Sequence, residues 1–145
     1  MYQHILIPTD GSELAERAVT HGLSLAKSLR AAVTVIFVEE PVPTGLWSAA
    51  ESRLAGIADI TAKYDEEIKK HATSVLGRVS NAAKQAGVLC DTAQVEDVQP
   101  YEAIIATATD RSCDLIVMAS HGRGGLSAVV LGSVTNKVLD RKSVV

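Results

Sequence analysis

A glycine-rich segment near the end of the chain has the residue types of a phosphate-binding loop. It contains Gly122, Gly124, Gly125 and Gly132, and a hydroxyl follows at Ser133. Glycine permits the left-handed or close-approach backbone geometry with which amides converge on an oxyanion. The pattern also starts a helix at Gly132–Ser133, whose free N–H groups and positive dipole end favour phosphate. The segment predicts an anion site, and a glycine-rich surface loop without a ligand is the alternative.

The spacing does not match two common phosphate motifs. A Walker loop needs a lysine before its hydroxyl residue, but Leu131 and Gly132 lead to Ser133 here. G-x-G-x-x-G also fails, because Ser127 stands at its last position. What remains is Gly122, nine residues, and then Gly132–Ser133.

This spacing resembles the G-x2-G-x9-G-[ST] signature of the universal stress protein family, in its ATP-binding branch. Ala119 stands where that signature has its first glycine, and alanine is the mildest replacement for it. The resemblance implies ATP, or ADP or AMP, as the ligand, with Mg²⁺ as an optional companion.

Alternating strands and helices must position this loop. Apolar, β-branched runs predict strands, and apolar residues at helical spacing predict helices. The strands are expected at 4–7, 33–38, 89–95 and 115–118, and the helices at about 13–29, 61–85, 100–110 and from 132 onward. Residues 41–60 are expected to form a loop, because Pro41, Pro43 and Gly45 break the backbone.

This order of elements predicts an α/β fold with a doubly wound parallel sheet, because strands that alternate with helices are joined by right-handed crossovers. The 145 residues fit a single nucleotide-binding domain over 1–145. The resemblance implies a Rossmann-like, adenine nucleotide alpha hydrolase-like sheet with strand order 3-2-1-4-5. The last strand would be truncated, since residues 143–145 supply only its beginning.

In a sheet of that order, the carboxyl ends of strands 1 and 4 flank the crevice where a ligand is expected. The resemblance implies that Asp10 contacts the base or ribose and that the Val38 backbone contacts the adenine edge. The other residues that it places around the nucleotide are Pro8, Thr9, Met118, Ala119, His121, Gly122, Gly132, Ser133 and Val134.

For three of these side chains, the sequence also allows a role other than ligand contact. Asp10 has the spacing to Glu13 of a helix-capping pair, and capping does not exclude ligand contact. His121 could donate to a phosphate or be satisfied by a backbone carbonyl. Arg123 could neutralise phosphate charge or be solvated.

The resemblance implies an ATP-binding stress-response regulator or sensor that acts as a homodimer on an unidentified protein partner. The alternatives are a slow ATPase or nucleotidyl-transfer enzyme on the same scaffold, and an interaction module with an empty crevice. No catalytic residue is assigned, because the loop lacks a Walker lysine and Asp10 is the one obvious carboxylate nearby.

Composition and residue spacing exclude several classes of protein. A formal charge of −3 argues against general nucleic-acid affinity. The sequence shows no apolar run of about 18 residues and no charged-then-apolar leader, so we expect a cytoplasmic protein without a membrane span. The histidines and cysteines have no metal-ligand spacing, so no metal site is predicted.

Overall fold

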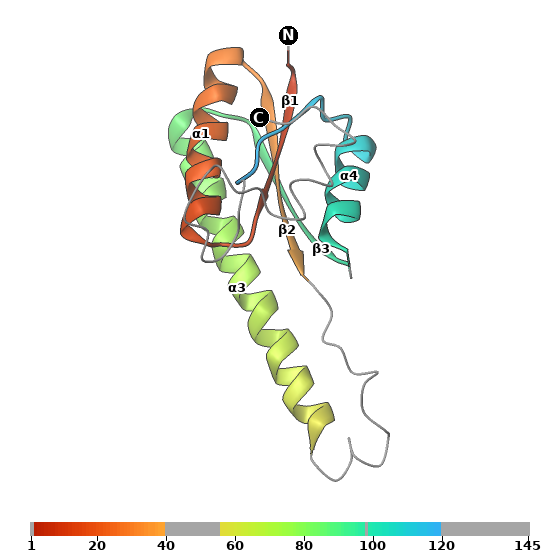
Figure 1. Cartoon of the computed structure of the whole chain (residues 1–145). Coiled ribbons are helices and arrows are strands. Elements are labelled where there is room, and N and C mark those ends of the chain that lie inside the picture. The colour runs from red at the N-terminus through yellow and green to blue at the C-terminus, as the bar shows by residue number, and fades with distance from the viewer. Residues whose placement is uncertain (1, 40–55, 98, 120–145) are drawn as a thin grey trace.

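A computed structural model describes residues 2–39, 56–97 and 99–119 of the chain (Figure 1). Four strands alternate with three helices in this part, and the labels follow Figure 1. The elements are β1 (His4–Thr9), α1 (Glu13–Leu29), β2 (Ala32–Glu39), α3 (Ile57–Ala86), β3 (Cys90–Glu96), α4 (Pro100–Asp110) and β4 (Leu115–Ile116).

The four strands form one parallel sheet in the order β3-β2-β1-β4. The register between β1 and β2 runs from His4↔Ala32 to Thr9↔Phe37. On its other side β1 pairs with β4 through Ile5↔Leu115 and Leu6↔Ile116. The doubly wound α/β fold is thus confirmed for strands 1 to 4, and the predicted fifth strand lies outside the described residues.

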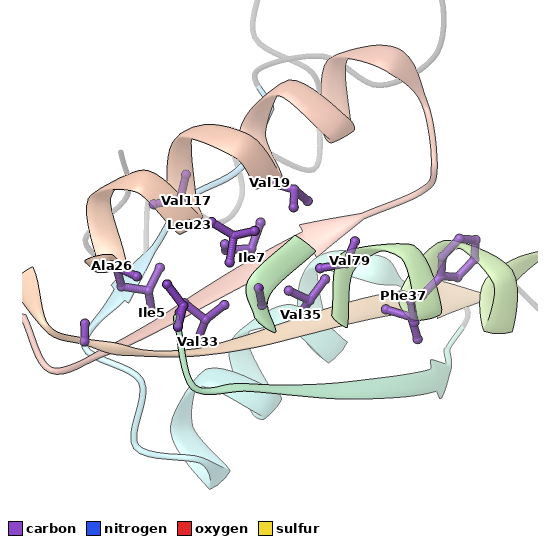
Figure 2. Packing of buried hydrophobic residues seen from close by; sticks show 14 of the residues in the cluster. Ile5, Ile7, Val19, Leu23, Ala26, Val33, Val35, Phe37, Val79 and Val117 are labelled. Atoms are coloured by element: carbon purple, nitrogen blue, oxygen red, sulfur yellow. The ribbon is translucent and has the colours of Figure 1, made fainter. Parts of the chain in front are cut away.

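Helices cover both faces of this sheet. Alternate residues of β1 and β2 pack under α1 and α3, as Figure 2 shows for Ile5, Ile7, Val33, Val35 and Phe37. The intervening side chains form a second core with α4, made of Leu6, Ile36, Ile104, Ala108, Cys113 and Ile116. The period of two along each strand explains why runs such as 5–7 are apolar throughout, since both faces are buried.

β2 and β3 lie within one residue of their expected bounds, whereas β1 and β4 each end two residues away from the expectation. β1 was expected to stop at Ile7 because Pro8 cannot donate to a ladder, but it continues to Thr9. Val117 N donates to Leu6 O, so the even-numbered residues of β1 face β4, and pairing with β4 ends before Pro8. The missing N–H of Pro8 therefore costs no ladder bond. β4 is shorter than the expected 115–118 and ends at Ile116.

Helix α3 begins at Ile57, four residues earlier than expected, and runs past the end of the sheet in Figure 1. Its buried stripe contains Ala72, Val75, Leu76, Val79 and Ala83, as the helical spacing predicts, whereas Ile68 is only half-buried. Gly87 ends the helix in the left-handed conformation at φ 73°. This confirms the predicted stop signal.

Candidate functional site

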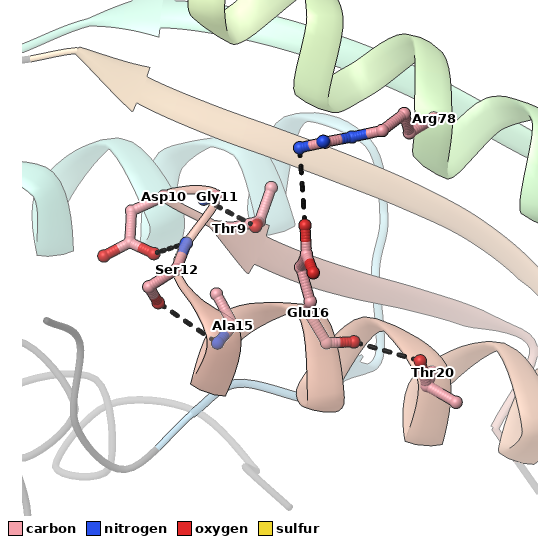
Figure 3. Close-up of polar contacts among 8 residues, drawn as sticks. All are labelled: Thr9, Asp10, Gly11, Ser12, Ala15, Glu16, Thr20 and Arg78. Carbon is pink, nitrogen blue, oxygen red and sulfur yellow. Dashed lines mark hydrogen bonds and ion pairs between the residues drawn. The ribbon is translucent and has the colours of Figure 1, made fainter.

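The turn after β1 carries the first group of predicted site residues. Thr9 Oγ1 accepts a hydrogen bond from Gly11 N at 3.1 Å, and Asp10 Oδ1 accepts one from Ser12 N at 2.8 Å (Figure 3). Ser12 Oγ in turn accepts from Ala15 N at 3.2 Å. The side chains of Thr9, Asp10 and Ser12 thus close the turn on its own backbone and hold the Asp10 carboxyl group at the carboxyl end of β1.

Asp10 does not cap helix α1, so the capping interpretation is wrong. Ser12 is the N-cap residue, with extended backbone angles and a side chain that accepts from the first turn. Asp10 instead braces the turn that leads to this cap, using Oδ1 alone. A ligand could donate a hydrogen bond to Oδ2 without breaking the bond between Oδ1 and Ser12 N.

Gly11 is required where the turn meets α3. Its φ is +79°, and a Cβ at this position would lie 2.9 Å from Val75 Cγ2 and 3.0 Å from His71 Nε2. The ring of His71 also stands edge-on to Phe37, with centroids 5.9 Å apart. The turn that carries Asp10 is therefore packed against α3, and sequence reasoning missed both Gly11 and His71 as its supports.

The neighbouring strand ends supply an apolar surface. Val38 and Met118 are half-buried and pack against the core on the α4 face. Pro8 is half-buried between their strands, because β1 lies between β2 and β4. Ala119 follows Met118 and is also half-buried. The structure thus brings six predicted site residues to the carboxyl ends of the strands: Pro8, Thr9, Asp10, Val38, Met118 and Ala119.

Glu39 directly follows Val38 and is 5% exposed, which is unusual for a carboxylate. Burial raises its pKa above the ordinary value, and Asp65 and Glu96 act in the same direction, while Lys69 opposes them. Lys69 Nζ itself lies 3.1 Å from Asp65 Oδ2. The carboxyl end of β2 is therefore acidic on the α3 face, a feature that the sequence signalled only as the pair Glu39–Glu40.

The remaining predicted site residues lie outside the described part of the chain. They are His121, Gly122, Arg123, Gly132, Ser133 and Val134. Within residues 2–39, 56–97 and 99–119, no group of His, Cys, Asp or Glu could hold a metal ion. No helix in the same ranges is long and apolar enough to cross a membrane.

The arrangement defines a class of protein. Helices α1 and α3 cover one face of the sheet, and α4, which leads into β4, covers the other. The direction in which the chain winds therefore reverses between β1 and β4, which are neighbours in the sheet. Doubly wound proteins bind their ligands at this switch point. The sequence profile described as the universal stress protein family matches residues 1–144. The chain belongs to this family, and the resemblance inferred from the glycine spacing is confirmed.

Individual relatives agree with this assignment. "Universal stress protein MJ0531" of Methanocaldococcus jannaschii is 34% identical over 140 residues, which are 96% of this chain and 76% of the relative. The solved structure of universal stress protein UspA from Lactobacillus plantarum has a TM-score of 0.83 at 22% identity, covering 99% of this chain and 96% of that one.

Two further solved structures share the fold and have a nucleotide in their descriptions. One is a universal stress protein in complex with cAMP, with a TM-score of 0.69 at 22% identity, covering 99% of this chain and 95% of that one. The other is a universal stress protein family protein from Arabidopsis thaliana with AMP bound. It has a TM-score of 0.65 at 16% identity, covering 99% of this chain and 89% of that one.

Proposed function

We propose that this universal stress protein binds an adenine nucleotide, ATP in the first place, at the carboxyl edge of β1, β2 and β4. The observation that carries the proposal is the meeting of the Asp10 turn with the half-buried Val38 and Met118 at the topological switch point. The cAMP and AMP bound to proteins of the same fold support an adenine nucleotide as the ligand class.

The apolar surface suits a purine base. Val38 lies in β2 and Met118 follows β4, on opposite sides of β1, and both face the α4 side of the sheet. A flat ring between them would remove apolar area from water, and the strand-end backbone at Val38 could read the ring edge by hydrogen bonding. Pro8 closes the space between them and has no N–H left to satisfy.

Asp10 provides the polar contact that fixes the orientation. Its Oδ1 is held by Ser12 N, so the carboxylate is already oriented before a ligand arrives. Preorganisation of this kind lowers the entropy cost of binding. A carboxylate also accepts hydrogen bonds from ribose hydroxyls, as acidic residues do in other nucleotide-binding sheets.

The phosphates are assigned to the glycine-rich segment. Gly122, Gly132, Ser133 and Val134 would supply amides and a hydroxyl, with Ala119 and His121 nearby and Arg123 as the one basic side chain in the span. Gly132→Val should weaken nucleotide binding at least tenfold, about 1.4 kcal/mol, because a side chain there would keep the amides from the phosphate.

Calorimetric titration with ATP, AMP and cAMP, with and without Mg²⁺, tests the proposal. Asp10→Asn should weaken ATP at least fivefold and leave the fold intact, because the amide oxygen can still accept from Ser12 N. Asp97→Asn is the matched control, since Asp97 Oδ1 accepts from Gln99 N at 2.9 Å in a similar turn after β3. The absence of binding by all three nucleotides at 1 mM would refute the adenine nucleotide site.

The biological role proposed with this site is that of a cytoplasmic stress-response regulator. A protein partner would read the nucleotide-bound state, and the protein would act as a homodimer. Support comes from family membership and from the glycine-rich segment, which lacks the lysine that a Walker loop uses in phosphoryl transfer. Light scattering that shows a monomer at micromolar concentration, with and without ATP, would contradict the dimer.

A further inference from the structure

Among the described residues, the outer edge of β3 presents backbone groups that no other strand pairs with. β3 is terminal in the sheet order, and no strand of the described ranges pairs with its outer side. Val33 N donates to Leu89 O, and Asp97 N donates to Glu39 O, each at 2.9 Å. In a parallel pair this pattern turns the odd-numbered residues of β3 toward β2. The N–H and C=O groups of the even-numbered residues point away from the sheet: Cys90, Thr92, Gln94 and Glu96.

This edge lacks most of the features that usually protect an edge strand. Natural sheets blunt their edges with proline, lysine, a β-bulge or a very short strand. β3 has seven residues, CDTAQVE, without proline or lysine. It pairs with β2 in unbroken register from Val33↔Cys90 to Glu39↔Glu96, so it has no bulge. The free side of β3 is therefore a regular template for one more strand.

A groove accompanies this edge on the α3 face. Its volume is about 380 Å³, and it is lined by Thr73, Leu76, Gly77, Ser80, Thr92, Ala93 and Gln94. A Cβ on Gly77 would meet nothing within 4 Å, so this glycine leaves the helix wall of the groove open. Gln94 Nε2 donates to Lys69 O and to Thr73 Oγ1, each at 3.3 Å, which fixes one end of the groove. The walls suit a small side chain with a hydroxyl group.

The charges along β3 indicate which strand would pair there. Asp91 and Glu96 are the charged residues of the strand, and both are acidic and exposed. The guanidinium of Arg111 lies 4.0 Å from Asp91, and the nearby Lys69 is paired with Asp65. A β3 edge from a second copy would bring another Glu96 and another Asp91–Arg111 pair, and so would add negative charge along this edge. A strand with lysine or arginine near its ends would complement it instead.

We propose that the outer edge of β3, with the α3 groove beside it, binds an extended segment of another protein by strand addition. Backbone hydrogen bonds to residues 90, 92, 94 and 96 supply the affinity, as in other cases of β-augmentation. Specificity comes from a small or hydroxyl side chain placed against Gly77 and from basic residues at the ends of the segment. The site is separate from the nucleotide site, because it lies on the opposite side of β2 from β1.

The probe is a nine-residue peptide with alternating valine and threonine, a central serine and a lysine at each end, acetylated and amidated. Binding is followed without nucleotide by NMR of the protein amides, using hydrogen exchange and chemical shifts. In the free protein the amides of Thr92 and Gln94 should exchange much faster than that of Ala93, which faces β2. The peptide should slow exchange at Thr92 and Gln94 at least tenfold when it saturates the protein.

Two comparisons separate strand addition from nonspecific binding. Gly77→Leu fills the groove and replaces a helix-interior glycine with a better helix former, so the protein should fold and bind the peptide at least fivefold more weakly. Ala82→Leu, at an exposed position of the same helix, is the matched control and should bind normally. A peptide with glutamate at both ends should bind at least fivefold more weakly at about 20 mM salt, because exposed charges are little screened there.

Each contrary result overturns the proposal. Slow exchange of Thr92 and Gln94 in the free protein would show that the edge is already covered by the chain itself or by a second copy. Failure of the lysine-ended peptide to protect these amides at 1 mM would show that the edge does not accept a strand. Equal binding by the Gly77→Leu protein and the parent would show that the groove does not bind the segment, and equal binding of the two peptides would show that charge does not select it. Either result would overturn the proposal as stated.

Discussion

Replacing Gly11 by alanine should separate two physical reasons for a glycine in the turn that carries Asp10. The residue has φ +79°, in the left-handed region that favours glycine, and its absent Cβ would lie 2.9 Å from Val75 Cγ2. Val75 is 1% exposed and packed in the core, so its methyl group has little room to move. The nearby His71 is exposed and can turn away.

The matched control is Gly87→Ala. Gly87 has a similar φ of +73°, but a Cβ there would meet nothing within 4 Å. Gly87→Ala should therefore destabilise the protein by about 1 kcal/mol, the cost of the left-handed conformation alone. Gly11→Ala carries the same cost plus overpacking against Val75, which is typically about 1–3 kcal/mol. The expected loss in the free energy of unfolding is about 3 kcal/mol for Gly11→Ala.

Urea denaturation followed by circular dichroism measures both variants. In a Val75→Ala background, Gly11→Ala should cost about as little as Gly87→Ala, because the contacting methyl groups are gone. Equal losses for Gly11→Ala and Gly87→Ala in the parent background would refute the contact argument. A loss below about 0.5 kcal/mol for both would refute the conformational argument as well.

Two further predictions concern the pH dependence of stability. Burial raises the pKa of Glu39 in the folded protein, so its ionised form destabilises the fold, and the penalty grows as pH rises through the folded pKa. Glu39→Gln should therefore stabilise the protein at pH 7, and this gain in thermal melts should disappear as pH falls below the ordinary value of 4.5. Burial works against ionisation of Asp114, but hydrogen bonds from the N–H groups of His4 and Gln3 outweigh it and lower its pKa. Its stabilisation is present above the ordinary value of 3.8 and is lost as pH falls through the folded pKa, so Asp114→Ala should cost about 1–2 kcal/mol at pH 7 and much less near pH 2. A constant difference between Asp114→Ala and the parent across that range would contradict the assignment.

The sheet was predictable from sequence because its strands are buried on both faces. Runs such as Val33–Val38 are mostly apolar and rich in β-branched residues, and a helical period separates each run from the next. Element ends were less predictable, because they depend on neighbours that the local pattern does not reveal. Pro8 stays in β1 because β4 has already ended beside it, and Ser12 rather than Asp10 caps α1 because the Asp10 side chain closes the preceding turn.

The candidate site was only partly predictable for the same reason. The family resemblance pointed to Asp10, Val38 and Met118, and the sheet order brings the chain segments that carry them together. The support that His71 and Val75 give to Gly11 depends on the path of α3 across the sheet, and no local motif encodes that path. The glycine spacing around Gly122 identified the family without a structure, and its part in phosphate binding stays a prediction.

The two proposed sites use different parts of one sheet. β1 is internal, with neighbours on both sides, so its backbone is satisfied and it can offer a ligand only the groups at its carboxyl end. β3 is external among the described strands, so it can offer a partner the whole length of its free edge. β2 lies between them, carries Val38 near its carboxyl end on the α4 face, and pairs with β3 along seven residues. β2 is therefore the strand that the two proposed sites share, because Val38 contributes to one of them and the ladder with β3 holds the edge used by the other.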